Sequence, residues 1–365
     1  MADRPLRIAI DGRELVGRPT GVGRYLLEVM RHWAEGPGTH RFTVILPAEP
    51  PPHLQALGDR FSWRVEPGAT PGTWWEQVRL PRALASERPD VLFAPGYTAP
   101  LRLRCPFVLA VYDVSFCAHP DWFGWREGLR RRWLTRAAAR RAQAVVTISE
   151  FSRAEIHRHL GVPADRVILA PPGAPPLAGA TPGPERAPLV LYVGSLFNRR
   201  HLPEMIEAFA IAARTVPAAR FVLIGDNRTS PRQDPDALAQ AAGVGDRVTW
   251  TAYVDDAARD RHYQSARTFL FLSDYEGFGM TPLEAAAFGV PSVVLDTPVA
   301  REVYGDGALR VPAAPAAIAD ALIRLLTNDA SHASTLAAAR ARVGQFSWAR
   351  SAAAILRALE VAARS

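Results

Sequence analysis

Two carboxylates eight positions apart, Glu276 and Glu284, lie in the part of the sequence best suited to chemistry on a ligand. Gly277 and Gly279 separate them and let the backbone turn and present its amides without side-chain obstruction. A helix is expected to begin at Thr281. Uncovered amides and the positive end of a helix dipole would then point at one place, which predicts an anion site. A diphosphate is its natural occupant.

A structural role explains one of these carboxylates more readily than the other. Thr281 is expected at the N-cap and Pro282 at the first helical position. Thr281-x-x-Glu284 therefore also fits a capping box, in which the glutamate only bonds back to the N-cap amide. Glu276 has no such role, because it lies in a glycine-flanked loop at a strand end. We predict that the two carboxylates bracket a sugar nucleotide, one on sugar hydroxyls and the other on the ribose, with the capping box left open for Glu284.

A glycine turn followed by two adjacent arginines lies upstream of this stretch. Gly194 and Ser195 follow an apolar strand, and Arg199 and Arg200 precede a helix expected from Leu202. Arginine makes planar two-pronged contacts to phosphate. The pair is therefore suited to neutralising a departing diphosphate, the largest charge that develops when a glycosidic bond to phosphate breaks. The alternative is a solvated, basic helix start.

The composition excludes several chemistries. The sequence of 365 residues contains no lysine, so all 43 basic side chains are arginines. Enzymes that need a phosphate-loop lysine or a pyridoxal Schiff-base lysine are thereby excluded. Cys105 and Cys117 form neither a Cys-x-x-Cys motif nor a zinc ligand set, and they fit a reducing compartment, with a disulfide between them left open. The formal charge of +7 suits an anionic ligand, a nucleic acid or a membrane face.

The expected elements alternate strand and helix, which is typical of parallel sheets with helices on both faces. The strands of the first half are expected at Leu6–Asp11, Phe42–Leu46, Val91–Phe93, Phe107–Val111, Ala144–Ile148 and Val167–Leu169, and its helices near Gly23–Glu35, Trp75–Glu87, Phe123–Arg141 and Glu150–Leu160. The strands of the second half are expected at Leu189–Val193, Phe221–Ile224, Val248–Thr251, Thr268–Leu272 and Ser292–Leu295. Its helices are expected near Leu202–Thr215, Asp234–Ala242, Asp256–Ser265, Pro282–Phe288, Ala313–Leu326, Ser331–Val343 and Trp348–Ala362.

Between the two halves lies a stretch rich in proline and glycine that holds neither a ladder nor a helix. We therefore expect a first domain over residues 1–172, a hinge over 173–188 and a second domain over 189–346. Ligands of open α/β sheets collect beyond the carboxyl ends of the strands, so a cleft between the domains is the expected binding place.

The run Glu-Gly-Phe-Gly-x-x-Pro-x-Glu-Ala from Glu276, followed by Gly-Val-Pro, closely resembles the signature of the retaining glycosyltransferases of family 4. The resemblance implies the GT-B fold: two Rossmann-like α/β domains that face each other across a cleft, with a C-terminal helix over residues 347–365 crossing back to the first domain. It also implies an NDP-sugar donor and a carbohydrate or lipid-linked acceptor, with no cofactor and no bound metal. The first glutamate would contact the transferred sugar and the second the ribose, and the donor-binding set would comprise Gly194, Ser195, Gly277, Phe278, Gly279, Met280, Thr281 and Glu284.

Two further motifs extend this resemblance, and a third departs from it. Gly21 and Gly23 lie in a loop that resembles the family's glycine-rich loop, which closes on the donor phosphate, whereas Leu26 replaces the third glycine of a dinucleotide fingerprint and so disfavours NAD. The run Arg199-Arg200-His201 is similar to the family's Arg-Lys-Asn. Tyr112-Asp113, however, stands where the family commonly has His-Asp. Tyrosine donates a hydrogen bond but does not titrate near neutrality, so Tyr112 either substitutes in positioning or the reaction is altered.

The remaining expectations concern surfaces and competing functions. The N-terminus lacks a secretory signal and no apolar run is long enough to span a bilayer, which indicates a cytoplasmic protein. The Arg- and Trp-rich stretch 122–141 could bind the inner face of an anionic membrane or an acidic acceptor, although its arginines spread around most of a regular helix. Nucleic-acid binding is less favoured because no stacking platform accompanies the charge. Two other functions stay open: an NDP-sugar-binding protein with little catalysis, and an epimerase or phosphorylase of the same fold.

Overall fold

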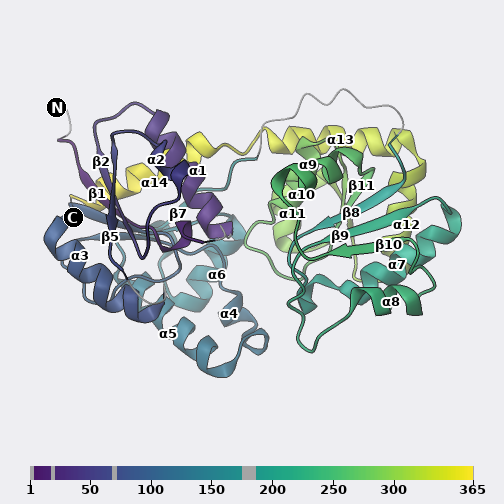
Figure 1. Cartoon of the computed structure of the whole chain (residues 1–365), viewed down its shortest axis with the longest axis horizontal. Helices are drawn as coiled ribbons and strands as arrows, with labels where there is room; N and C mark the ends of the chain where they lie inside the picture. The colour runs from purple at the N-terminus through teal and green to yellow at the C-terminus, as the bar shows by residue number, and fades with distance from the viewer. Residues whose placement is uncertain (1–3, 18–20, 68–71, 175–185, 365) are drawn as a thin grey trace. The chain divides into compact units, whose positions relative to one another are not determined.

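The computed structural model describes residues 4–17, 21–67, 72–174 and 186–364, and these fold as two compact units (Figure 1). Unit 1 comprises Met1–Gly173 and Ser347–Ser365, and unit 2 comprises Ala174–Phe346. Residues 175–185 of the expected hinge lie outside the described residues. Each unit carries its own parallel sheet, so the expected two-domain α/β class is confirmed.

Unit 1 is built on a seven-stranded sheet in the order β3-β2-β1-β4-β5-β6-β7. Every neighbouring pair is parallel. The central strands are apolar and buried along their whole length, as parallel strands must be when helices cover both faces of the sheet. The strands are β1 (Arg7–Asp11), β2 (Arg41–Leu46), β3 (Phe61–Val65), β4 (Val91–Ala94), β5 (Phe107–Ala110), β6 (Ala144–Thr147) and β7 (Val167–Leu169).

The helices of unit 1 bury one face each and leave the other polar. In the first helix Leu26, Val29, Met30 and Trp33 recur at helical spacing and are fully or almost fully buried. The longer helices and their extensions are α1 (Gly21–Glu35), the wide turn η2 (Trp75–Arg79) that continues into α3 (Leu80–Glu87), α5 (Trp125–Arg141), α6 (Glu150–Leu160) and α14 (Trp348–Ala362). Shorter turns are η1 (Arg13–Leu15), α2 (Pro52–Gln55), α4 (Ser115–Ala118), η3 (Pro120–Trp122) and η4 (Ala164–Arg166).

The C-terminal helix α14 packs on the N-terminal part of the chain, as expected. Figure 1 shows it in yellow among the purple and blue elements of unit 1. The indole nitrogen of Trp33 donates to the main-chain oxygen of Ala352 at 2.9 Å. Gly173 lies directly against Trp348, since a Cβ added there would come within 2.4 Å of the indole Cδ1. A side chain at position 173 would therefore clash with Trp348, the first residue of the returning helix, which Ser347 caps.

Unit 2 repeats the design with a six-stranded sheet in the order β10-β9-β8-β11-β12-β13. All of its neighbouring strands are parallel as well. The strands are β8 (Leu189–Val193), β9 (Arg220–Ile224), β10 (Val248–Thr251), β11 (Thr268–Phe271), β12 (Ser292–Leu295) and β13 (Ala308–Val311). The helices and short turns are η5 (Asn198–Arg200), α7 (Leu202–Thr215), α8 (Pro235–Ala241), α9 (Asp256–Ser265), α10 (Thr281–Ala287), α11 (Pro298–Tyr304), η6 (Gly305–Gly307), α12 (Pro315–Thr327) and α13 (Asp329–Val343).

The elements that the sequence does not predict lie mainly at the sheet edges. β3 and β13 are the outermost strands of their sheets, and each is only partly buried. A serine and an arginine interrupt the apolar residues of β3, and an arginine interrupts those of β13, so no continuous apolar run marks either strand. Helix α11 is also unpredicted, although Thr297 caps it by accepting from the Ala300 amide at 3.3 Å.

Candidate functional site

The candidate donor site lies at one edge of the sheet of unit 2. Strands β8 and β11 are neighbouring parallel strands, so their carboxyl ends meet at the same edge. The loop from Gly194 to His201 follows β8, and the loop from Leu272 to Met280 follows β11. Two sequence segments that were predicted separately as parts of a sugar-nucleotide site are thereby brought together.

Arg200 and Glu276 form the central contact of this edge. Arg200 Nη2 lies 2.9 Å from Glu276 Oε1, and the hydroxyl of Ser273 donates to the same carboxylate oxygen at 2.7 Å. The guanidinium of Arg200 lies over the ring of Phe271, 4.4 Å from its centroid, and its side chain is 10% exposed. Its Nε and Nη1 atoms are buried and have no hydrogen-bond partner among the described residues. The arginine is therefore held by one carboxylate while two nitrogens keep donating capacity.

The neighbouring Arg199 is placed differently. Its guanidinium lies over the ring of Phe197, 4.3 Å from the centroid, and its main-chain oxygen accepts from the Asp274 amide at 3.1 Å. Asp274 also holds His201 through a 2.7 Å contact from its Oδ1 to Nε2. That hydrogen bond, with a weaker contribution from Glu204, raises the pKa of His201 although burial opposes it. Two loops are thus tied together by main-chain and side-chain contacts.

Glycines let these loops approach one another closely. Gly194 has φ +148° and Gly225, which follows β9, has φ +150°. A Cβ on Gly225 would lie 1.9 Å from the oxygen of Gly194, so no larger residue fits there. Gly279 has φ +81°, and a Cβ on it would lie 2.1 Å from the hydroxyl of Tyr304, which donates to the oxygen of Gly279 at 2.7 Å. Gly225 and Tyr304 were not among the predicted site residues, because no local motif marks them.

The start of α10 corrects one prediction. The N-cap residue is Met280 and makes no side-chain cap bond, so Thr281 is the first helical residue and not the N-cap. The hydroxyl of Thr281 is buried and has no hydrogen-bond partner among the described residues. The Glu284 amide donates instead to the oxygen of Met280 at 3.0 Å. The capping box is therefore not formed, because the helix begins one residue earlier than the Thr-Pro signal indicates.

The other donor-side predictions lie on α10, on the loop before it and on the turn after β8. Glu284 Oε2 lies 3.4 Å from the hydroxyl of Tyr263, a fully buried side chain whose pKa is raised by burial. Phe278 is buried and meets Phe346 edge to face with ring centroids 5.0 Å apart. The hydroxyl of Tyr192 donates to the oxygen of Ser195 at 3.0 Å and so shapes the turn after β8.

In unit 1, Tyr112 and Asp113 follow β5. Tyr112 is 6% exposed, packs edge to face against Tyr25 and Tyr97, and its hydroxyl has no hydrogen-bond partner among the described residues. Burial raises the pKa of Tyr112 well above its usual value, so the phenol stays neutral. Asp113 accepts from the hydroxyl of Tyr97 and from the amide of Ser115, both at 2.8 Å. Asp113 therefore has a local structural role, whereas the Tyr112 hydroxyl has none.

The two glycines of the N-terminal loop fall in the first turn of α1. Gly21 begins the helix, and a Cβ on it would meet nothing within 4 Å. Gly23 is buried in the same turn. The helix thus begins two residues before the expected start.

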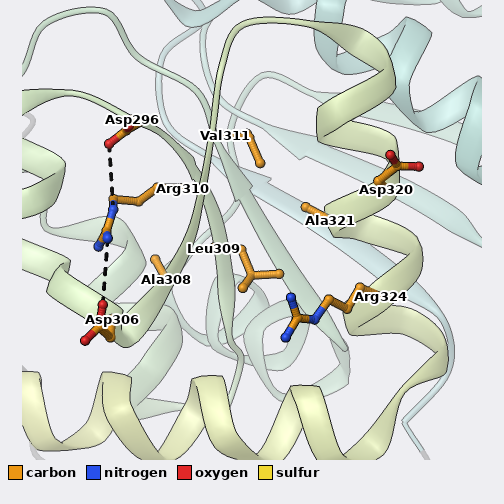
Figure 2. Close-up of a pocket in the computed structure, with 9 residues that line it drawn as sticks. All are labelled: Asp296, Asp306, Ala308, Leu309, Arg310, Val311, Asp320, Ala321 and Arg324. Carbon is orange, nitrogen blue, oxygen red and sulfur yellow. Dashed lines mark ion pairs between the residues drawn. The ribbon is translucent and has the colours of Figure 1, made fainter.

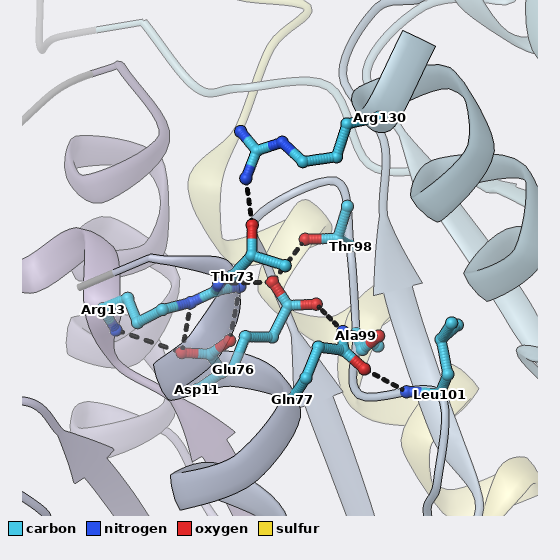
Figure 3. Close-up of polar contacts among 9 residues, drawn as sticks. All are labelled: Asp11, Arg13, Thr73, Glu76, Gln77, Thr98, Ala99, Leu101 and Arg130. Atoms are coloured by element: carbon cyan, nitrogen blue, oxygen red, sulfur yellow. Dashed lines mark hydrogen bonds and ion pairs between the residues drawn. The ribbon is translucent and has the colours of Figure 1, made fainter. Parts of the chain in front are cut away.

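A buried charged network that the sequence does not predict supports this end of unit 1 (Figure 3). Arg13 contacts Asp11 through Nη2 at 2.8 Å and Glu76 through Nη1 at 2.5 Å, and the three side chains are 11%, 1% and 2% exposed. The Thr98 hydroxyl donates to Glu76 Oε2 at 2.7 Å, and the side-chain amide of Gln77 donates to Glu76 Oε1 at 2.8 Å. Burial raises the pKa of Asp11, and Arg13 opposes that shift. The network joins the ends of β1 and β4 to the wide turn before α3.

A cavity of about 510 Å³ lies elsewhere, at the outer edge of the sheet of unit 2 (Figure 2). It lies between β13 and α12. Arg310 stands between Asp296 and Asp306, 3.7 Å from each, so these charges satisfy one another. None of the predicted site residues lines this cavity.

The described part of the chain comprises residues 4–17, 21–67, 72–174 and 186–364. No group of three or more His, Cys, Asp or Glu side chains in these ranges could hold a metal ion. Asp255 instead caps α9 by accepting from the Ala258 amide, and Asp256 pairs with Arg259 at 2.7 Å. No helix in the same ranges is both long enough and apolar enough to cross a membrane.

Family models match both halves of the chain. The model described as "Glycosyltransferase Family 4" matches residues 19–176, and the model described as "Glycosyl transferases group 1" matches residues 179–342. The protein is thus a glycosyltransferase. The chain belongs to family 4, the group 1 glycosyltransferases of the GT-B fold, as the motif around Glu276 indicates.

Curated relatives and solved structures agree with this assignment. The chain is 28% identical over 286 residues to the O-antigen chain mannosyltransferase B of Escherichia coli, which covers 73% of each chain. It is 31% identical over 198 residues to the phosphatidyl-myo-inositol mannosyltransferase of Mycobacterium leprae, covering 53% of this chain and 50% of the relative. Among structures, HepE of Anabaena in complex with UDP and glucose aligns with a TM-score of 0.76 at 18% identity, over 98% of this chain and 100% of HepE. The sucrose-phosphate synthase of Thermosynechococcus elongatus aligns with a TM-score of 0.77 at 18% identity, over 96% and 98% of the two chains.

Proposed function

We propose that the protein transfers a hexose from a nucleoside-diphosphate sugar to an acceptor hydroxyl with retention of the anomeric configuration. The acceptor would be a carbohydrate or a lipid-linked glycan. The contact of 2.9 Å between Arg200 Nη2 and Glu276 Oε1 at the shared edge of β8 and β11 carries this proposal. It pairs a guanidinium suited to phosphate oxygens with a carboxylate suited to sugar hydroxyls.

The proposed reaction needs the leaving diphosphate to be stabilised. The acceptor oxygen bonds to the anomeric carbon on the face from which the diphosphate leaves, as the bond from that carbon to the phosphate oxygen breaks. The acceptor proton passes to the departing phosphate oxygen. Negative charge therefore develops next to the bond that breaks, and preorganised donors aimed at that charge lower the barrier.

Arg200 is suited to bridge the sugar and the diphosphate. One of its nitrogens is fixed on Glu276, while Nε and Nη1 are buried without a partner and keep the capacity to donate to phosphate oxygens. Ser273 donates to the same Glu276 oxygen that Arg200 contacts and so helps to fix the carboxylate. Arg199 would add charge, and Glu284 on α10 would hold the ribose. The donor base is proposed to be uracil or guanine.

The names of the relatives suggest which donors to test first. Two curated relatives are mannosyltransferases, which favours a mannosyl donor, and HepE was solved with UDP and glucose, which favours UDP-glucose. We therefore propose GDP-mannose, UDP-glucose and UDP-mannose as the first candidates. A thermal-shift screen that includes ADP-sugars would rank them, because a ligand that binds only the folded state raises its stability.

The decisive experiment follows the sugar itself. The protein is incubated with a donor labelled in the hexose and with candidate acceptors, and the product is examined by mass spectrometry and by NMR of the anomeric carbon. A new glycoside of the donor's own anomeric configuration supports the proposal. Transfer with inversion, or a labelled sugar that returns only as its epimer or sugar phosphate, would contradict it.

A binding protein with little catalysis is the second candidate, and Tyr112 favours it. A tyrosine replaces the histidine of the resembling family, and its buried phenol is neutral and has no hydrogen-bond partner among the described residues. The two candidates are separated by calorimetry and transfer measured on one preparation. Tight nucleotide-sugar binding without transfer to any acceptor would favour the binding protein. A Tyr112→His variant that gains transfer would indicate that Tyr112 limits catalysis in the wild type.

A further inference from the structure

Helix α5 presents an exposed apolar stripe. Trp125, Leu129 and Trp133 follow one another at a spacing of four residues and are 71%, 55% and 61% exposed. At about 100° per residue, the three side chains fall within an arc of about 80°. Contiguous large apolar side chains on a surface mark a site of interaction with a partner or a membrane.

A fourth exposed aromatic residue lies next to this stripe. Trp74 is 58% exposed, and its neighbour Thr73 accepts a hydrogen bond from Arg130 of α5, as Figure 3 shows. The guanidinium of Arg79 lies over the Trp74 ring, 5.3 Å from its centroid. We call Trp74, Trp125, Leu129 and Trp133 together the aromatic patch.

The charge around the aromatic patch is strongly positive. Helix α5 contains seven arginines and one glutamate. Arg131 turns inward, where its guanidinium lies over the rings of Tyr97 and Phe116, and Arg132 donates to the main-chain oxygen of Phe116. The other arginines of the helix are exposed, and no described carboxylate forms an ion pair with any of them: Arg126, Arg130, Arg136, Arg140 and Arg141.

The structure therefore modifies the expectation that the spread of arginines disfavours membrane binding by this helix. Counted over the whole helix, the arginines spread around its circumference, which disfavours a membrane-bound helix. Arg131 and Arg132 are half-buried against Tyr97 and Phe116, whereas the other five are exposed, although Arg130, Arg136, Arg140 and Arg141 each also donate to an oxygen of unit 1. At about 100° per residue, the five exposed arginines fall within an arc of about 160° that also contains Trp125, Leu129 and Trp133.

We propose that the aromatic patch docks unit 1 on an anionic lipid bilayer. Tryptophan is favoured at the membrane interface, where its ring is half in the acyl region and its N–H stays hydrated. Arginine makes two-pronged contacts to lipid phosphates, and each basic residue near an anionic surface adds to the attraction. Apolar side chains surrounded by exposed guanidinium groups that form no ion pair with a described carboxylate match that interface in both respects.

A second copy of the chain fits the same surface less well. Two copies that met through the aromatic patch in a symmetric dimer would bring their exposed arginines face to face without carboxylates to offset them. An acidic protein or a single-stranded nucleic acid would satisfy the charge, but neither has an acyl region into which three tryptophans and a leucine could insert. The bilayer is therefore the occupant that the whole set favours. This inference is independent of the donor chemistry proposed above.

The test measures binding of the full-length protein to sedimented vesicles of phosphatidylcholine alone and with one-third phosphatidylglycerol. The patch variant carries Trp125→Ser, Leu129→Ser and Trp133→Ser, and the charge variant carries Arg126→Gln and Arg130→Gln. Tyr253→Ser is the matched control, because Tyr253 is 65% exposed in unit 2. Thermal unfolding shows whether each variant is folded.

The wild type is expected to bind the anionic vesicles and to bind the neutral ones weakly. The patch variant should lower the partition coefficient at least about tenfold, and the charge variant about fivefold for each arginine removed. Tyr253→Ser should change nothing. Equal binding by the wild type and the patch variant, or no binding of the wild type to anionic vesicles, overturns the proposal.

A second measurement on the wild type distinguishes insertion from adsorption and does not depend on any variant. Brominated acyl chains quench tryptophan fluorescence only when indoles enter the bilayer, so quenching is expected with anionic vesicles. Vesicle binding without quenching contradicts insertion of the aromatic patch. Concentration-dependent dimers or RNA binding that the patch variant abolishes, with no vesicle binding, would assign the surface to one of those partners instead.

Discussion

Arg200 and Glu276 hold one another in place at the carboxyl ends of two neighbouring strands, with 2.9 Å between Nη2 and Oε1. Removal of either side chain is therefore expected to lower the free energy of unfolding. The arginine is 10% exposed, and two of its nitrogens already have no hydrogen-bond partner among the described residues. Removing the carboxylate would leave a third polar nitrogen buried without its acceptor.

We therefore predict that Glu276→Ala lowers both stability and donor binding. The free energy of unfolding should fall by about 2 kcal/mol, the cost of leaving a buried donor without its acceptor. Transfer should fall by about two orders of magnitude, because a charge-assisted hydrogen bond to the sugar is lost. Urea unfolding and initial rates of transfer measure the two effects. Glu207→Gln on the exposed face of α7 is the control, and equal effects of both variants would contradict a site at Glu276.

A second prediction concerns the close approach of two loops at Gly225. Gly225→Ala should destabilise unit 2 by about 3 kcal/mol or more, because the added Cβ would lie 1.9 Å from the Gly194 oxygen and φ is +150°. Gly243→Ala is the matched control: φ is +72°, but nothing lies within 4 Å of its Cβ, so about 1 kcal/mol is expected. Thermal and urea unfolding compare the two. Equal losses would show that contact with Gly194 does not limit the residue at position 225.

A third prediction concerns pH and two histidines with opposite shifts. The pKa of His201 is raised above 6.5, chiefly by its hydrogen bond to Asp274, so the folded state binds its proton more tightly than the unfolded state. Its stabilising contribution is complete below pH 6.5 and is lost as the pH rises through the folded-state pKa. Asp274→Asn should flatten that part of the stability curve.

His332 gives the opposite slope. Burial lowers its pKa below 6.5, so the unfolded state binds the proton more tightly, and the protein loses stability as the pH falls below 6.5. The midpoint of urea unfolding, measured from pH 5 to pH 8 for the wild type, His201→Asn and His332→Asn, separates the two. Removal of either histidine without a change in slope would contradict the corresponding assignment.

A fourth prediction concerns the charged network of Figure 3. Arg13→Met should destabilise unit 1 by about 3 to 5 kcal/mol at neutral pH, because the buried carboxylates of Asp11 and Glu76 would face each other without a cation. Protonation relieves that repulsion, so the loss should shrink as the pH falls toward 5. Arg64→Met is the control, since Arg64 pairs with Glu66 and Glu87 but is 29% exposed. Similar losses in both variants, measured by urea unfolding, would show that burial does not set the cost.

The sequence predicts the regular part of the fold well, because buried parallel strands and amphipathic helices carry their own signals. Eight elements, including β8 and α7, have the predicted bounds. The edge strands β3 and β13 are not predicted, because half-exposed strands mix apolar and polar residues. The start of α10 is misplaced because local capping preferences favour threonine, whereas packing of the loop decides where the helix begins.

The candidate site is predictable only where its parts are local. Glu276, Glu284 and the pair Arg199-Arg200 lie in short motifs with recognisable chemistry. The contact between Arg200 and Glu276 joins separate motifs, and the roles of Gly225 and Tyr304 arise only from packing across the sheet edge. The network of Arg13 with Glu76 is likewise a long-range contact, 63 residues apart, that no spacing rule predicts.

The return of α14 to unit 1 also affects how the chain is made. The ribosome completes unit 2 before it synthesises residues 347–365, so the half that is translated first waits longest for its last element. Until then Trp33 has no Ala352 oxygen to accept from its indole, and the apolar surface beside Gly173 stays open to water. A nascent chain stalled before Ser347 should therefore expose on unit 1 the apolar surface that α14 normally covers. Chaperones that bind apolar surface are expected to bind there, even though most of unit 1 is already synthesised.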